Sequence, residues 1–410
     1  MDPDLSQLDA YLDADGHDGY LVDADSSDST QRYLSGFDAP DPFVTVYTPE
    51  RTALLVSALE YGRAKKESRA DDVSRLADHD YRALAAEHGA GEAKARVVAA
   101  WLDDLGVDSV ATPERFPLGP ADRLRERDVS VEPESEDVVT DIRARKTPEE
   151  IEHIRTAQQA NEAAMRAAAE LLEDATVVES DDADADTSDI TVGTDEGDRQ
   201  ILRYDGDVLT SERVKEEIEV TLLRHGCALD ETIVACGADA ADPHNRGSGP
   251  LRPNEPIIVD IFPQNKASKY HADMTRTFCR GEPDDTVREW YDLTEEAYRA
   301  ALDAVEPGVE GEAIHDAACD VYEDAGLPTL RSDEAAETGF IHSTGHGVGL
   351  DVHEGPRIGP GVDVLEPGHV ITIEPGLYDP DVGGVRIEDL VVVTEDGSEN
   401  LTDYRVELEV

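Results

Sequence analysis

Five potential metal ligands, each in a distinctive local sequence, constrain what this chain can fold into: Asp260, Asp273, His346, Glu374 and Glu388. Asp260 and Glu374 each end an apolar run typical of a buried strand, and Glu388 stands shortly before another such run. An ionised carboxylate in a buried strand is costly unless it is paired or holds a metal. Carboxylates with one imidazole suit two adjacent divalent cations, whose shared water becomes a hydroxide near neutral pH. The sequence therefore predicts a two-metal hydrolytic centre, with Glu374 also taking the proton of the attacking water.

The acidic composition limits what any single carboxylate can prove. The chain has 94 Asp plus Glu in 410 residues and a net charge of −58, so a lone strand carboxylate could equally be salt-bridged. Such a charge repels nucleic acid phosphates and anionic membranes, which excludes both as expected partners. Apolar periodicity persists along most of the chain, so we expect a folded protein with an acidic surface. A cytosol of very high salt, as in a halophilic archaeon, would screen the self-repulsion.

The cysteines and the N-terminal residues indicate the cellular compartment in which we expect the protein. The four cysteines show no CxxC or zinc-ribbon spacing, and we expect small buried hydrophobes in a reducing environment. The segment Met1–Asp4 has neither a basic region nor an apolar stretch, so no signal peptide is expected. No apolar run approaches the length of a membrane span. The expectation is a soluble, cytoplasmic protein.

The chain should hold two domains, with a boundary near residue 140. Residues 1–140 alternate short strand and helix patterns and carry no chemical motif, which predicts an α/β domain. The expected strands are Gly19–Val22, Phe43–Tyr47, Thr52–Val56 and Ser109–Ala111, and the expected helix includes Ala95–Leu102.

A long helix is predicted to begin after Thr147, which with Glu150 forms a capping box. Its apolar stripe is interrupted by Gln158 and Asn161, which leaves the middle of that face open. A second helix is expected from Ser211. Its apolar face is Val214, Ile218, Leu222 and Leu223.

Between these helices, residues 175–206 form an acidic segment poor in apolar residues, which we interpret as an exposed inserted loop. A calcium site is the alternative interpretation, but the segment lacks EF-hand spacing, so a solvated loop is favoured.

The remaining chemistry requires a donor for a developing oxyanion and a proton carrier for a leaving amine. His244, His342 and His353 are the candidates, although His244 could equally be an exposed loop residue. Asp260 and Asp273 are expected to flank a hairpin. His346 lies in a glycine-rich run, where we expect the backbone to approach an ion or substrate closely.

These motifs resemble those of the pita-bread metallopeptidases, which include methionine aminopeptidase, aminopeptidase P and prolidase, with creatinase as a metal-free relative. The resemblance implies that the five residues named first are the metal ligands, in the family's order. It also implies substrate or catalytic contacts for the three histidines. Tyr378 and Arg386 match positions that support the substrate site in proline-specific members.

The resemblance implies a creatinase-like N-terminal α/β domain over residues 1–140 and a pita-bread domain of α+β type over residues 141–410. Methionine aminopeptidase lacks such an N-terminal domain, which favours the proline-specific branch. The implied activity is that of an Xaa-Pro aminopeptidase, with Xaa-Pro dipeptidase (prolidase) as the alternative. Two manganese or cobalt ions, short peptides with proline at the second position, and a homodimer or dimer of dimers are implied as cofactors and partners.

Two departures from the family pattern concern the hairpin. The gap between Asp260 and Asp273 is longer than usual, and Phe262-Pro263 stands where a glycine is common. Two rivals of other classes remain: a non-catalytic peptide-binding module on the same fold, and a creatinase-like amidinohydrolase. The complete ligand set argues against both.

Overall fold

The computed structural model describes residues 3–179 and 200–410 of the chain. Its contacts divide the chain into two compact units, Met1–Arg143 and Ala144–Val410. Each unit has its own core.

The first unit is built on a six-stranded sheet with the order β4-β3-β2-β1-β5-β6. The pairs β1–β2 and β2–β3 are antiparallel, whereas β3–β4, β1–β5 and β5–β6 are parallel. All four strands expected in this region lie within strands of the sheet. The strands are β1 (Gly19–Ala24), β2 (Phe43–Thr48), β3 (Arg51–Val56), β4 (Asp72–Arg75), β5 (Ser109–Thr112) and β6 (Ser130–Pro133).

Helices cover both faces of this sheet because side chains alternate along each strand. Leu55 of β3 belongs to one apolar cluster with Val98 and Trp101 of α5, whereas the adjacent Leu54 packs with Ala64 of α3. The helices are α1 (Ser6–Asp15), α2 (Ser29–Ser35), α3 (Tyr61–Glu67), η1 (Leu76–His79), α4 (Tyr81–His88), α5 (Ala90–Leu105), α6 (Leu118–Arg125) and α7 (Val138–Ala144).

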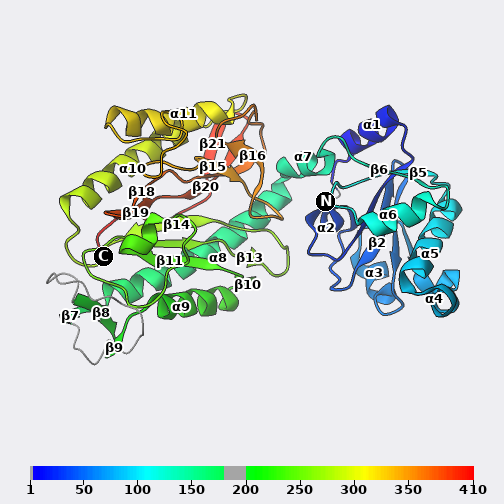
Figure 1. The fold of residues 1–410 in the computed structure, drawn as a ribbon, viewed down its shortest axis with the longest axis horizontal. Helices are drawn as coiled ribbons and strands as arrows, with labels where there is room; N and C mark the ends of the chain where they lie inside the picture. The colour runs from blue at the N-terminus through cyan, green and yellow to red at the C-terminus, as the bar shows by residue number, and fades with distance from the viewer. Residues whose placement is uncertain (1–2, 180–199) are drawn as a thin grey trace. The chain divides into compact units, whose positions relative to one another are not determined.

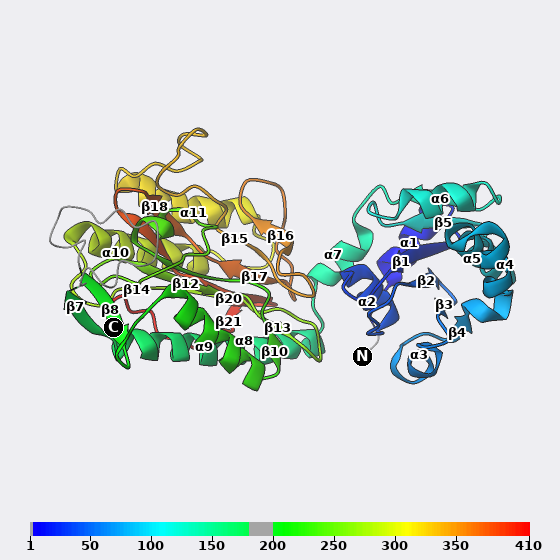
Figure 2. The same cartoon turned by 60° about the horizontal axis from the view of Figure 1, so that its bottom comes forward.

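In the second unit, sheets lie between two pairs of helices, α8 with α9 and α10 with α11 (Figures 1 and 2). A three-stranded antiparallel sheet β11-β12-β14 shares an apolar core with α8 and α9, and a five-stranded sheet β16-β15-β17-β20-β21 shares another with α10 and α11. The helices are α8 (Pro148–Glu173), α9 (Ser211–Arg224), η3 (Gly237–Ala241), α10 (Asp285–Asp303) and α11 (Gly311–Asp324).

The strands that frame this unit come from the whole second half of the chain. The first set is β10 (Cys227–Ala228), β11 (Thr232–Cys236), β12 (Ile257–Ile261), β13 (Gln264–Asn265) and β14 (Met274–Phe278). The second set is β15 (Gly345–Gly347), β16 (Glu354–Ile358), β17 (Val370–Ile373), β18 (Gly376–Asp379), β19 (Gly383–Arg386), β20 (Asp389–Thr394) and β21 (Gly397–Asn400).

Helix α8 begins as predicted, since Thr147 and Glu150 form the capping box. The two polar residues in its stripe do not interrupt the buried face. Gln158 donates from Nε2 to Thr402 Oγ1 at 2.8 Å, and Asn161 donates from Nδ2 to the Ile261 carbonyl at 2.6 Å. Both side chains are buried because each has a partner on a neighbouring segment.

The prediction of one exposed loop over residues 175–206 is wrong at its two ends, and residues 180–199 lie outside the described part of the chain. The described ends form an antiparallel sheet of β7 (Thr176–Glu179), β8 (Gln200–Tyr204) and β9 (Asp207–Val208). Ile201 and Leu202 are buried there, so apolar residues at the end of the segment outweigh its acidic average. The predicted face of α9 is wrong for Leu223, which is 61% exposed, because it stands about 100° around the helix from Leu222.

Within the described residues, no helix is both long and apolar enough to cross a membrane.

Candidate metal centre

Asp260 and Asp273 are brought together by two antiparallel strands. Asp260 lies in β12 and pairs with Thr275 of β14, while Asp273 stands directly before β14. Both carboxylates are buried. The predicted hairpin is present, with the short strand β13 in its connection pairing with β10.

His346 and Glu374 come from a second pair of strands. His346 lies in β15, next to β17, and Glu374 follows the last residue of β17. Thr372 links them: its Oγ1 accepts from the His346 N–H at 3.0 Å and donates to Glu374 Oε1 at 3.2 Å. One hydroxyl thus sets the backbone of His346 relative to the carboxylate of Glu374.

Glu388 joins the group from the segment between β19 and β20. Its N–H donates to the Thr275 carbonyl at 3.1 Å, and its Oε2 accepts from Thr275 Oγ1 at 2.7 Å. Thr275 therefore holds Glu388 beside the strand that Asp273 precedes.

The ligand atoms of Asp273, His346 and Glu388 all lie within 4.8 Å of one another. His346 Nε2 is 3.8 Å from Asp273 Oδ2 and 3.3 Å from Glu374 Oε1. On the other side of the ring, Nδ1 lies 3.1 Å from the Gly347 carbonyl, which can only accept, so the proton belongs on Nδ1 and the lone pair of Nε2 faces the carboxylates.

The carboxylates of this cluster are buried close to one another, so in the absence of a cation their negative charges repel. Burial, followed by the neighbouring carboxylates, raises the pKa of Asp273 and of Glu388 well above the usual range. Burial also raises the pKa of Glu374 to about 7. Like charges at this separation in a desolvated site favour either protonation or a bound cation.

The residues present fit divalent cations. Asp260 Oδ1 is buried and has no hydrogen-bond partner among the described residues, which leaves it free for an ion. Carboxylate oxygens with one neutral imidazole form a donor set suited to manganese and similar ions. A bound cation would remove the repulsion that raises the carboxylate pKa values.

A buried arginine lies beside the carboxylates. Arg386 donates from Nη2 to Asp260 Oδ2 at 2.7 Å, from Nε to Thr275 Oγ1 at 3.2 Å and from Nη1 to the Tyr378 hydroxyl at 2.8 Å. Burial opposes its charge, but Tyr378 and the neighbouring carboxylates raise its pKa well above the usual value. The prediction that Arg386 and Tyr378 support the substrate site stays a prediction; both side chains are buried.

His342 is engaged at both ring nitrogens. Nδ1 lies 2.7 Å from the Ser343 carbonyl and must carry the proton, so Nε2 accepts from the Tyr378 hydroxyl at 3.0 Å. Burial, followed by the charge of Arg386, lowers the pKa of His342 to about 3. Both ring nitrogens of His342 thus have partners within the protein, and its catalytic role stays a prediction.

His353 and His244 are the exposed histidines of the candidate set. The His353 ring meets the His346 ring edge-on, with centroids 4.3 Å apart, and partial burial of the ring, followed by the charge of His346, lowers the pKa of His353. His244 lies on a loop close enough for its charge to act on Glu374, His342 and His353.

The glycines around His346 lie against neighbouring backbone, and the expected close approach to an ion or substrate stays a prediction. A Cβ on Gly345 would stand 2.0 Å from the Thr372 carbonyl, and one on Gly347 would stand 2.1 Å from the Gly355 carbonyl. The missing side chains allow the neighbouring backbone to pack closely around β15.

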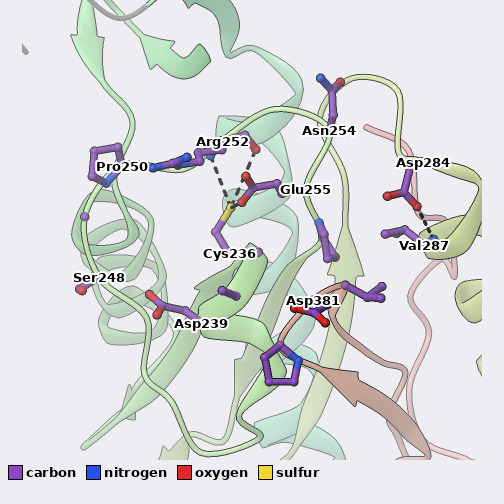
Figure 3. A pocket seen from close by; sticks show the side chains of 16 residues that line it. Cys236, Asp239, Ser248, Pro250, Arg252, Asn254, Glu255, Asp284, Val287 and Asp381 are labelled. Atoms are coloured by element: carbon purple, nitrogen blue, oxygen red, sulfur yellow. Dashed lines mark hydrogen bonds between the residues drawn. The ribbon is translucent and has the colours of Figure 1, made fainter. Parts of the chain in front are cut away.

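A cavity of about 740 Å³ lies apart from this cluster and is lined by none of the expected site residues (Figure 3). In it, Cys236 is hydrogen-bonded to Arg252 and Glu255. Asp239, which also lines it, accepts from Asn245 at 3.2 Å and so anchors the residue next to His244. The cavity therefore borders the base of the His244 loop.

Two threonines that organise the site, Thr275 and Thr372, were not predicted from the sequence. Thr372 stands two residues before Glu374, at the end of a strand, so the two-residue period places both side chains on one face. This period could have indicated from the sequence that Thr372 lies beside Glu374. For Thr275, the partner Glu388 is too distant in sequence for any local pattern to indicate.

Two family models match this chain, one in each unit. Residues 152–395 match the model of metallopeptidase family M24, and residues 5–128 match the creatinase/prolidase N-terminal domain. The chain is 27% identical to the Xaa-Pro dipeptidase of Pyrococcus horikoshii over 414 residues, which cover 100% of this chain and 99% of that protein. It is 44% identical over 178 residues to the probable dipeptidase PepE of Mycobacterium tuberculosis, of which the match spans 45%.

The solved structures agree with the fold. The prolidase of Pyrococcus horikoshii superposes with a TM-score of 0.74 at 26% identity, over 98% of this chain and 99% of that one. The expected architecture, a creatinase-like N-terminal domain followed by a pita-bread domain, is confirmed.

Proposed function

Because the chain belongs to metallopeptidase family M24, we propose that it hydrolyses the peptide bond between an N-terminal residue and proline, with Xaa-Pro dipeptides as substrates. The observation that carries the proposal is the convergence of Asp273, His346 and Glu388 ligand atoms within 4.8 Å. The names of the relatives favour a dipeptidase over the aminopeptidase that was predicted from the sequence.

The proposal assigns the ligand positions to Asp260, Asp273, His346, Glu374 and Glu388. When bound, two divalent ions, which we propose to be manganese, would polarise the scissile carbonyl and lower the pKa of water. Asp260 would present the oxygen that Arg386 does not hold.

The protein's own groups would move the protons. Glu374 Oε1 accepts from Thr372, so Oε2 would hold the proton taken from water and pass it to the leaving amine. His353 and His244 are exposed and can reach a bound peptide, so we assign them to the developing oxyanion. His342 and Tyr378 would orient Arg386.

The test is metal content measured together with hydrolysis of Ala-Pro, Ala-Pro-Gly and Ala-Ala by the full-length protein. We expect manganese-dependent cleavage of Ala-Pro, weaker cleavage of the tripeptide and none of Ala-Ala. Comparable cleavage of the tripeptide would instead indicate the aminopeptidase. Metal-loaded protein that cleaves neither proline peptide would contradict the proposal, and creatine turnover by metal-free protein would indicate the amidinohydrolase.

We also propose a homodimer, on the family resemblance alone. Sedimentation velocity of the purified protein would measure it, and a monomer at assay concentration would contradict it.

A further inference from the structure

A buried ion pair outside the metal cluster reaches the turn that carries His353. Lys146 Nζ lies 3.0 Å from Glu354 Oε2, and each side chain is 1% exposed. Two charges removed from water in this way are stable only when their geometry and hydrogen bonds are well satisfied. The pair therefore fixes the position of the Glu354 carboxylate.

The Glu354 carboxylate lies inside the turn between β15 and β16. Its Oε1 accepts from the Asp351 N–H at 3.0 Å, and Glu354 pairs with Gly347 across the two strands. A Cβ on Gly349 would stand 2.5 Å from Glu354 Oε2, so the missing side chain leaves room for the carboxylate. Residues of the turn between β15 and β16 thus pack against the Glu354 carboxylate.

The lysine is held at its backbone. The Lys146 N–H donates to the Gly368 carbonyl at 2.9 Å, and the neighbouring Arg145 forms a bridge with His369, directly before β17. Since β17 pairs with β15, the lysine extends from a point fixed to the same sheet that holds His346. Both ends of the ion pair are thus tied to the frame of the metal cluster.

His353 is the residue immediately before Glu354. Its ring meets the His346 ring at a centroid distance of 4.3 Å and an angle of 64°. His353 therefore belongs to the same turn that the Glu354 carboxylate holds in place.

We propose that the Lys146–Glu354 ion pair positions His353 against His346, which makes both members positioning residues for the hydrolysis. The kinetic consequence rests on the proposed function, whereas the ring contact does not. Loss of the pair would let the turn relax and His353 move away from His346.

The test compares Lys146→Met with Arg145→Met in the full-length chain. Arg145 is the adjacent residue, and its ion pair with Glu366 is exposed, so it is a matched control. Ring signals of ¹³C-labelled histidine are recorded without added metal, and the His353 signal is assigned by its loss in His353→Gln. Steady-state kinetics on Ala-Pro are measured with manganese.

In Lys146→Met we expect the His353 signal to shift as its ring leaves His346. We expect kcat to fall about tenfold or more, with KM within about twofold. Arg145→Met should match the wild type in the His353 signal, in kcat and in KM. If Lys146→Met does not fold, Lys146→Met/Glu354→Gln leaves no unpaired buried charge and should show the same signal shift.

An unchanged His353 signal in a folded variant lacking the ion pair would overturn the proposal and leave the pair with a role in stability alone. A shifted signal in a protein whose wild type cleaves no proline peptide would support the positioning and contradict only the proposed function.

Discussion

Arg386 and Asp260 form a buried ion pair in which Nη2 donates to Oδ2 at 2.7 Å, while Oδ1 of the same carboxylate has no partner among the described residues. One oxygen is fixed by the protein and the other is left for a cation. The guanidinium also lies near Glu374 and Glu388, whose charges contribute to its raised pKa. This arrangement orients a proposed ligand and partly neutralises the carboxylates around it.

Arg386→Met should destabilise the metal-free protein by about 3–5 kcal/mol, because it leaves Asp260 buried without a counter-charge. Manganese should raise the melting temperature more in the variant than in the wild type, since the ions then supply all of the neutralising charge. Urea unfolding and thermal melting, each with and without manganese, measure both effects. Arg51→Met, which removes an exposed ion pair with Asp72, should change stability by at most about 1 kcal/mol. Equal stability of Arg386→Met and Arg51→Met would contradict the view that Arg386 stabilises buried Asp260.

Glu388→Ala should abolish metal retention and peptide cleavage together, because it removes a carboxylate from the group that converges on one point. Metal bound per chain and turnover of Ala-Pro are measured on the same preparation. Glu395→Ala is the matched control, since Glu395 is exposed at the far end of β20. An active, metal-loaded Glu388→Ala protein would remove Glu388 from the ligand set.

Glu134→Gln should change the pH dependence of the first unit. Burial raises the pKa of Glu134 to about 7, and its Oε1 accepts from the Tyr20 hydroxyl at 2.7 Å. A raised folded-state pKa means that the folded unit binds the proton more tightly, so its stabilising effect is present below about pH 4.5 and is lost as pH rises through about 7. The variant, which stays neutral, should therefore gain stability relative to the wild type across that window.

Trp101 reports on this unit, because the only other tryptophan, Trp290, lies in the second unit. Urea unfolding followed by fluorescence in a Trp290→Phe background gives the difference between Glu134→Gln and its parent at each pH. A difference that stays constant from pH 4 to 8 would show that Glu134 does not titrate in this way.

Potassium chloride should raise the melting temperature of the protein. A net charge of −58 repels itself in the folded state, and the screening length falls from about 10 Å at 0.1 M salt to about 3 Å at 1 M. Most of the gain should therefore appear below about 1 M if screening is the cause. Melting curves across a potassium chloride series measure it, and equal stability in dilute buffer would rule out the high-salt hypothesis.

The sequence was informative where a local pattern decides the structure. The capping box of Thr147 and Glu150 starts α8, and the apolar runs before Asp260 and Glu374 form strands, because caps and two-residue periodicity act over a few neighbouring residues. Average composition was a poor guide for residues 175–206, where the buried pair Ile201 and Leu202 helps to form a strand.

Partners distant in the chain could not be predicted. Gln158 and Asn161 interrupt the apolar stripe of α8 in the sequence, yet both are buried because they donate hydrogen bonds to Thr402 and to the Ile261 carbonyl. The contact between His342 Nε2 and the hydroxyl of Tyr378 likewise joins residues 36 positions apart. Each outcome depends on which segments become neighbours, and sequence periodicity specifies burial without specifying that choice.

By itself, the sequence determined the kinds of groups at the site and their places at strand ends, because hard ligands flanked by apolar runs need no tertiary information to be recognised. Only the tertiary structure decided that these groups meet within a few ångströms, that Arg386 holds Asp260, and that Lys146 reaches the turn beside His353. Long-range strand pairing and buried charge pairs fix those relationships, and both are properties of the assembled unit.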